Sequence, residues 1–353
     1  MTPSEFMEPR DMTTIRLPAE WEPQDGVMLA WPHQATDWQP MLEQAEMVFA
    51  HIIREIAMQE KVVIAAPDTA RVEDRLASAG VRLANVRTYQ ISTNDTWARD
   101  FGPVTIFVQG EATLLNFGFN GWGLKFPACL DNCVTSHLYA MGAFSGISLA
   151  TMGLILEGGS IESDGNGTIM TTAECLLNPN RNPHLSRQEI EEELFALLGA
   201  ERVLWLENGY LAGDDTDCHI DTLARFAPDD TILYVACDNP EDEHFESLKA
   251  MREELELLQT KDERGYRLLP LPWPRPRLDN DGQRLPATYA NFLVINGAVL
   301  VPTYDDPADS VALETVQQAF PGRKVIGINC LPLIQQHGSL HCVTMQFPKG
   351  VLS

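Results

Sequence analysis

One local pattern recurs along the chain, a helical segment followed by a short apolar segment, and it constrains the fold more than any other feature. Residues 40–58 carry apolar side chains at the spacing of one helix face, and the apolar run 61–66 predicts a buried strand. Five such units favour one closed, repetitive α/β architecture over two independent domains, so we predict a single domain spanning residues 1–353. The four later units are predicted as helix then strand at 130–144 and 147–150, 186–198 and 203–206, 241–258 and 266–269, and 307–320 and 324–328.

Pairs of strands joined by short turns are predicted between these units. Residues 104–108 and 113–117 flank a turn at Gly110, and 292–295 and 299–302 flank Asn-Gly. The stretch 270–286 is rich in Pro, Asp and Asn and has the composition of a linker. A domain boundary is one interpretation of it. We favour a long surface loop inside the fourth unit, lying over the functional site.

Cys342 is the first candidate for chemistry. Residues 343–346 predict a short strand, and the turn at Gly338-Ser339 would place Cys342 at its start. A cysteine at such a rim can act as a nucleophile when its surroundings favour the thiolate. The alternative is a half-buried structural cysteine, because free cysteines are commonly buried and inert.

Carboxylates in two other stretches could hold a cation. If the segment around Asp100 is extended, Trp97 and Arg99 share one face and Asp100 lies on the other. Asp100 could then bind a planar cation beside an aromatic wall, although a surface Asp–Arg pair would explain the same residues. Glu157 precedes Gly158-Gly159, which either form a simple turn or let the backbone approach a ligand closely.

His219 and Asp221 are two positions apart and would face the same way on a strand. A structural histidine is the alternative, since His-X-Asp is a common sequence. Asp214, Asp215 and Asp217 precede the pair, and this concentration of carboxylates would raise the pKa of the histidine and attract cations.

The composition narrows the class of ligand. The chain has 50 acidic and 25 basic residues, for a formal charge of −25, which repels nucleic acids and anionic membranes and attracts small cations. Its 7 cysteines show no disulfide spacing, residues 1–10 do not resemble a secretory signal, and no apolar run reaches the ~20 residues of a membrane span. We therefore expect a cytoplasmic protein with no nucleic-acid or membrane partner.

A structural metal site is not expected. Cys129 and Cys133 share a helix face, and His337 and His341 have a similar spacing, but neither pair has the second pair of ligands that a structural zinc site needs.

The chain resembles the agmatine deiminase and bacterial-type peptidyl-arginine deiminase family of the guanidino-group-modifying (pentein) superfamily. The matching segments run in the family's order over nearly the whole sequence. They are Trp31-Pro32, NDTWARDFGP at 94–103, FNGWG at 119–123, LEGGSI at 156–161, TTAECLLNPNRNP at 171–183, DCHID at 217–221, YANF at 289–292 and LHCVTMQ at 340–346.

The resemblance implies a fold and a mechanism. The fold is a five-bladed α/β propeller, in agreement with the five predicted units. Cys342 would be the nucleophile and His219 the general acid and base, while Asp100 and Asp221 would hold the guanidinium. No metal or organic cofactor is implied.

The resemblance also implies a substrate and the residues around it. Trp97, Glu157 and Asn291 would lie beside a small cationic guanidine. Agmatine is the expected substrate, because it has a second cation and no carboxylate, and the predicted site is rich in acids. These acids are Asp95, Asp214, Asp215, Asp217, Asp305 and Asp306.

Three alternatives stay open at this point. The substrate could be peptidyl arginine or a methylated arginine, which this chain's departures from the family's motif at Cys218 and 337–339 leave undecided. The protein could be a non-catalytic binder of cationic ligands. It could also be a metal-dependent hydrolase that uses His219, Asp221, His337 and Cys342. The oligomeric state, including a homo-oligomer, is left open.

Overall fold

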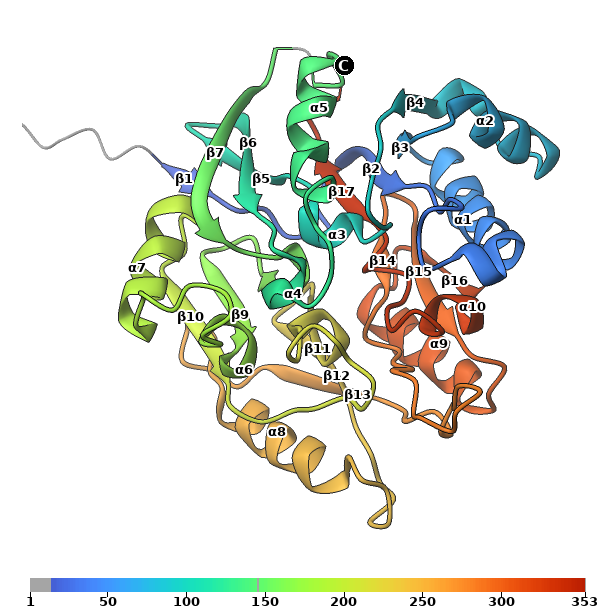
Figure 1. Ribbon diagram of the computed structural model, residues 1–353. Helices are drawn as coiled ribbons and strands as arrows, with labels where there is room; N and C mark the ends of the chain where they lie inside the picture. The colour runs from blue at the N-terminus through green and yellow to red at the C-terminus, as the bar shows by residue number, and fades with distance from the viewer. Residues whose placement is uncertain (1–13, 145, 353) are drawn as a thin grey trace, which may run out of the picture.

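Five separate β-sheets make up the framework of the protein (Figure 1). The computed structural model describes residues 14–144 and 146–352, so the prediction about a signal in residues 1–10 falls outside the described part. The sheets have the strand orders β1-β5-β6-β7, β10-β9-β8, β11-β12-β13, β14-β15-β16 and β17-β2-β3-β4.

Every sheet contains the same unit, two antiparallel strands followed by a helix and a parallel strand. In one sheet β11 (Ala224–Ala227) pairs antiparallel with β12 (Thr231–Val235), helix α8 (Phe245–Leu257) follows, and β13 (Arg267–Leu271) pairs parallel with β12. This connection is the βαβ crossover that parallel strands require. The predicted helix–strand unit is therefore confirmed in all five sheets.

The other units have the following bounds. The first comprises β1 (Ile15–Arg16), β5 (Val104–Val108), β6 (Glu111–Gly118), α5 (Val134–Ala140) and β7 (Ser148–Ile155). The next comprises β8 (Ile161–Ser163), β9 (Thr168–Thr172), α6 (Ala173–Leu176), α7 (Arg187–Leu198) and β10 (Arg202–Leu206). Another comprises β14 (Leu293–Val294), β15 (Ala298–Thr303), α9 (Ala308–Ala319) and β16 (Lys324–Asn329).

The two ends of the described chain share the remaining sheet. Strand β17 (Met345–Pro348), red in Figure 1, pairs antiparallel with the blue strand β2 (Gln24–Ala30). Helix α1 (Leu42–Ala57) leads to β3 (Lys61–Ala66), and α2 (Thr69–Ser78) leads to β4 (Val86–Gln90). The segment that carries Cys342 thus leads into a strand that is held by β2.

Apolar strands and one face of each helix form the core. In α1 the buried side chains include Phe49, Ile52, Ile53 and Ile56, which recur at helical spacing and pack against the buried strand β3. Burying such a face is what stabilises a helix of this length in a protein, since intrinsic helix propensity alone is weak.

The predicted boundaries were wrong in three places. Only Val134–Ala140 of the predicted helix 130–144 is α-helical, preceded by a 3₁₀ turn at Asp131–Cys133. Strand β13 reaches Leu271 inside the proline-rich stretch, which is possible because β13 is an edge strand and Pro270 need not donate a hydrogen bond. Strand β17 begins at Met345, and Cys342 lies in the turn before it.

None of the helices in the described ranges, 14–144 and 146–352, combines the length and apolar character that a bilayer crossing requires. The cytoplasmic location stays a prediction.

Candidate active site

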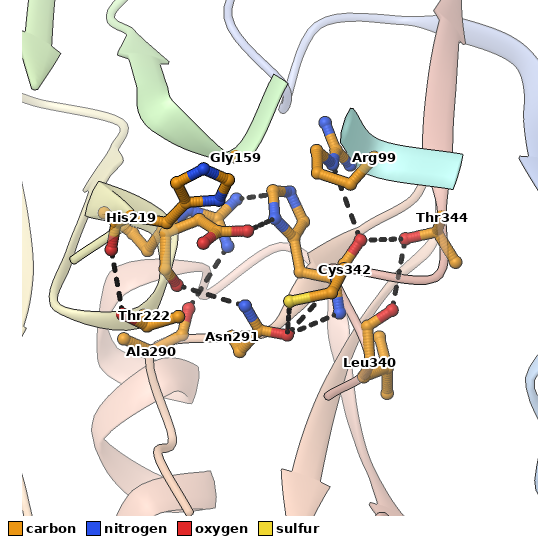
Figure 2. Close-up of polar contacts among 12 residues, drawn as sticks. Arg99, Gly159, His219, Thr222, Ala290, Asn291, Leu340, Cys342 and Thr344 are labelled. Atoms are coloured by element: carbon orange, nitrogen blue, oxygen red, sulfur yellow. Dashed lines mark hydrogen bonds and ion pairs between the residues drawn. The ribbon is translucent and has the colours of Figure 1, made fainter. Parts of the chain in front are cut away.

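Cys342 lies in a tightly bonded turn just before β17 (Figure 2). Its carbonyl oxygen accepts a 3.1 Å hydrogen bond from the N–H of Arg99. The side-chain oxygen of Asn291 accepts from both the Cys342 N–H and its thiol, each at 3.3 Å. The residue is 6% exposed. These bonds fix the position of the sulfur in a largely buried site.

The surroundings of Cys342 favour the thiol over the thiolate. Burial raises its pKa well above the ordinary value, and the charges of Asp221 and Asp100 raise it further. A cation bound among these carboxylates would act in the opposite direction and favour the thiolate.

Asp100 belongs to the short helix α3 (Ala98–Phe101), so the prediction of an extended segment here was wrong. Its carboxylate accepts hydrogen bonds from the indole N–H of Trp122 and the backbone N–H of Gly159, both at 3.0 Å. Burial, followed by the charges of Asp221 and Glu157, raises the pKa of Asp100 well above its usual range despite these bonds.

His219 directly precedes a 3₁₀ turn at Ile220–Thr222, and the predicted strand is absent at this position. Its Nδ1 lies 3.6 Å from Oδ1 of Asp100, and its buried Nε2 has no hydrogen-bond partner among the residues that the structure describes. Burial lowers the pKa of His219 to about 3, so the ring is neutral, and the predicted rise in its pKa was wrong.

Asp221 is completely buried and differs from Asp100 in its charge state. Its Oδ2 lies 2.7 Å from Nδ1 of His341, while its Oδ1 has no partner. Burial favours the neutral acid, but the hydrogen bond and charge of His341 outweigh it and lower the pKa of Asp221. The surroundings of the two carboxylates thus shift their pKa values in opposite directions, upward for Asp100 and downward for Asp221.

Gly159 marks the point at which these groups converge. A Cβ atom at this position would lie 2.6 Å from Nδ1 of His219, 2.9 Å from Oδ1 of Asp100 and 3.1 Å from Oδ2 of Asp221. Three segments that are far apart in the sequence therefore bring His219, Asp100 and Asp221 together around the Cα hydrogen of Gly159.

Two further predicted residues are buried beside this centre. Oε1 of Glu157 accepts a 2.7 Å bond from Arg181, and its Oε2 has no partner. Asn291 bonds to Cys342 as described above, and its amide lies 3.4 Å from the carbonyl oxygen of Asp221. Neither residue lines the neighbouring pocket, so their substrate-binding roles stay predictions.

A pocket opens beside Asp100 and Cys342. Trp97, which we predicted to lie beside the substrate, is part of its wall. The lining of the pocket includes aromatic rings, several carboxylates, His337 and Gly338. The aromatic residues are Trp97, Trp122 and Phe126, and the acidic residues are Asp37, Asp95, Asp100, Asp214 and Asp215.

The other acids predicted near the site do not reach the pocket. Asp217 forms ion pairs with Lys125 at 2.7 Å and Arg181 at 2.6 Å. Asp306 pairs with Arg277, and Asp305 does not line the pocket either. Residues of the stretch 270–286 do not line this pocket, but several of them line an adjacent hollow that shares Asp214 and His337 with it. The position of this stretch over the site stays a prediction.

A sequence model of the Porphyromonas-type peptidyl-arginine deiminase family matches residues 16–348. The chain belongs to this family. Agmatine deiminase of Pseudomonas syringae pv. tomato is 34% identical over 357 residues, covering 95% of each chain. The solved structure of C. jejuni agmatine deiminase, a cysteine-to-serine variant with substrate bound, is 39% identical with a TM-score of 0.89, covering 96% of this chain and 97% of that one. A Porphyromonas gingivalis protein solved as a candidate arginine deiminase is 48% identical with a TM-score of 0.91, covering 96% and 100%.

Several polar residues of this deiminase-family site were not singled out from the sequence. Trp122 bonds to Asp100, Arg181 bonds to Glu157, and Glu20 and Arg225 lie behind Asp221. Trp122 and Arg181 lie inside segments that carried the resemblance, and this was the available signal. No sequence signal pointed to Glu20, because Arg225 and His341, to which its side chain bonds, are more than 200 residues away in the chain.

Two buried clusters contain side chains of the types that bind metals. Glu157 lies near Cys175 and His219, and Glu20 lies near Glu162 and His341. In both clusters an arginine already pairs with the carboxylates, Arg181 in the first and Arg225 in the second. The four residues of the metal-hydrolase alternative form no such cluster in the described part of the chain.

Proposed function

We propose that this protein hydrolyses agmatine to N-carbamoylputrescine and ammonia through a covalent intermediate on Cys342. The observation that carries the proposal is the junction at Gly159, where His219, Asp100 and Asp221 meet beside the pocket that Cys342 lines. A guanidinium is planar and poorly electrophilic, so it must be fixed by carboxylates before a thiolate can attack its central carbon.

The unpaired atoms of the site suit this cation. Oδ1 of Asp221 and Oε2 of Glu157 are buried acceptors without partners, and a guanidinium offers N–H donors in one plane. Leaving such acceptors unsatisfied costs about 1–3 kcal/mol each, which a bound guanidinium would recover.

In the proposed reaction His219 first accepts the proton of the Cys342 thiol. The thiolate attacks the guanidinium carbon, and the C–N bond to one terminal nitrogen breaks as that nitrogen takes the proton from His219 and leaves as ammonia. A water molecule then gives a proton to His219 and attacks the amidino-thioether. Collapse of this adduct breaks the C–S bond, its hydroxyl proton is released as the C=O bond of the ureido product forms, and the proton on His219 returns to the sulfur of Cys342.

The walls of the pocket support agmatine over substrates with an α-carboxylate. Among the described residues that line it, five are carboxylates and none is lysine or arginine. A carboxylate-bearing substrate would meet uncompensated negative charge, whereas the distal ammonium of agmatine would be attracted. The acids nearest the opening include Asp215, whose side chain is 42% exposed.

We also propose that the five sheets are the blades of a five-bladed α/β propeller forming one catalytic domain. The support is that all five share one strand pattern and that the last sheet joins both ends of the described chain. The proposed steps use only side chains of this chain and water.

A panel of guanidines assayed for ammonia and for the ureido product tests the function. Agmatine is expected to have the highest kcat/KM, followed by free arginine, a methylated arginine and an arginine peptide. A higher kcat/KM for the peptide or for free arginine would contradict agmatine as the preferred substrate but would still support deimination as the reaction. No ammonia from any of them would favour a non-catalytic binder.

A further inference from the structure

A row of alternating buried charges extends behind Asp221, away from the pocket. His341 follows Asp221, and then come Glu20, Arg225 and Glu162. Arg225 lies 2.7 Å from Oε2 of Glu20 and also pairs with Glu162. All five residues are buried, and His341 and Arg225 are each only 1% exposed. The proposed reaction uses only the first of them.

Both ring nitrogens of His341 face carboxylate oxygens. Nδ1 lies 2.7 Å from Oδ2 of Asp221, and Nε2 lies 2.7 Å from Oε2 of Glu20. An ionised carboxylate can only accept, so each short contact needs an N–H on the ring. The geometry therefore corresponds to an imidazolium that donates in both directions.

Arg225 is a second donor close to Nε2 of His341, and its charge opposes a second proton on the ring. Its Nη2 lies 3.1 Å from Nε2 of His341, and both atoms point at the same oxygen of Glu20. Two cations this close repel each other, and the ionised Glu20 and Glu162 offset that repulsion. Glu20 is the residue that makes a charged His341 tolerable in a buried site.

The consequence for Asp221 follows from its two oxygens. Because Oδ2 is held by His341, the carboxylate cannot rotate freely, and Oδ1 stays unpaired. Burial alone would neutralise the acid, as it does for Asp100. A neutral Asp221 would bind a guanidinium poorly.

We propose that His341 and Glu20 act as a positioning pair that keeps Asp221 ionised and oriented with one oxygen free for the guanidinium. The pair touches neither the thiol nor the pocket, so its effect is transmitted through Asp221. The consequence for catalysis rests on the proposed function, whereas the charge state of His341 does not.

Other charged or titratable groups also face the pair. Those that interact electrostatically with Asp221 are His341, His219, Arg225, Arg99, Asp100 and Cys342. Those around His341 are Glu20, Asp221, Arg225 and Glu162. Of these neighbours, only Glu20 and Asp221 make short carboxylate contacts with the imidazole.

Glu20→Gln tests the pair with little change in shape, and Glu162→Gln is a matched control. Both acids are buried and both pair with Arg225, but Glu162 has no hydrogen bond to His341. In the Glu20→Gln variant the pKa of Asp221, read from the ¹³C shift of its carboxyl carbon, is expected to rise by about one pH unit, because a neutral His341 no longer stabilises the carboxylate. The Glu162→Gln variant should lose stability without this shift.

The charge state of His341 is measured directly by ¹⁵N–¹H spectra of the histidine rings, with its signals identified by their loss in His341→Gln. The wild-type protein is expected to show two N–H groups on this ring at neutral pH, and Glu20→Gln one. A singly protonated ring in the wild type would overturn the proposal even if agmatine is turned over. An equal rise in the pKa of Asp221 in both variants would also overturn it, by showing a general effect of lost charge. A doubly protonated ring in a protein inactive toward agmatine would uphold the positioning pair and refute the proposed function.

Discussion

The backbone N–H of Gly159 donates a 3.0 Å hydrogen bond to Oδ1 of Asp100, the carboxylate that lines the pocket next to Cys342. Glycine allows this approach, since any Cβ would be too close to His219, Asp100 and Asp221 at once. The position therefore constrains the geometry of the whole site.

Gly159→Ala is expected to reduce kcat for agmatine at least ~100-fold, because displacing reacting groups by about 1 Å has effects of this size. Gly153→Ala is the control, since a Cβ there would meet nothing within 4 Å. Steady-state kinetics and thermal unfolding of both variants check the prediction. Near-normal turnover in Gly159→Ala would mean that His219 and the two carboxylates are not jointly required.

Cys342→Ser should abolish turnover and leave the fold intact, because a hydroxyl is a far weaker nucleophile than a thiolate near neutral pH. Mass spectrometry of the wild-type protein quenched during turnover should show an adduct on the peptide that contains Cys342. Cys129→Ser is the control, as Cys129 is exposed and distant from these contacts. Substantial activity in the Cys342 variant would exclude the covalent mechanism.

Binding of agmatine to Cys342→Ser should release a proton. The pKa of Asp100 is raised by burial in the empty site, and a bound cation favours its ionised form, so affinity should rise with pH. Calorimetry in two buffers of different ionisation enthalpy measures the released proton. At pH 7.5 Asp95, with a pKa of about 6, is already ionised and does not contribute to the proton release.

Asp100→Asn in the same background should remove the proton release, and Asp214→Asn should retain it. Asp214 is a suitable control because burial raises its pKa too, although it bonds to Thr216 and Cys218. In the wild-type background Asp100→Asn and Asp221→Asn should each cost about 3 kcal/mol of transition-state stabilisation. Unchanged proton release in Asp100→Asn would assign it to another group.

Glu60→Gln should stabilise the protein at pH 8. Burial raises the pKa of Glu60 from 4.5 to about 7, so the folded state retains a proton that the unfolded state has lost, and stability falls as pH rises from 4.5 to 7. Glutamine does not ionise and so removes this loss of stability. The loss amounts to up to about 3 kcal/mol, because the pKa values of the folded and unfolded states differ by about 2.5. Glu55→Gln, which removes a 3.1 Å ion pair with Arg54, should not stabilise. Thermal unfolding at pH 5 and pH 8 compares them, and equal effects of Glu60→Gln at both pH values would contradict the prediction.

The sequence by itself determined the repeating unit and the residues that could carry the chemistry. Amphipathic spacing over 40–58 and apolar runs such as 61–66 are local signals, because a helix or strand buries its own periodic face. Cys342, His219, Asp100 and Asp221 were recognised because the residue types needed for guanidine chemistry occur in motifs that read in order along the chain.

Only the tertiary structure decided how those residues are oriented and which carboxylates are free. The short turns at Ala98–Phe101 and Ile220–Thr222 replace the predicted extended segments. Asp215 lines the pocket, while Asp217 is held by Lys125 and Arg181. Glu20 reaches His341 across 321 positions of sequence. No local pattern encodes such pairings, because each depends on contacts between sheets whose strands are distant in the chain, and those contacts set both the charge and the direction of a buried side chain.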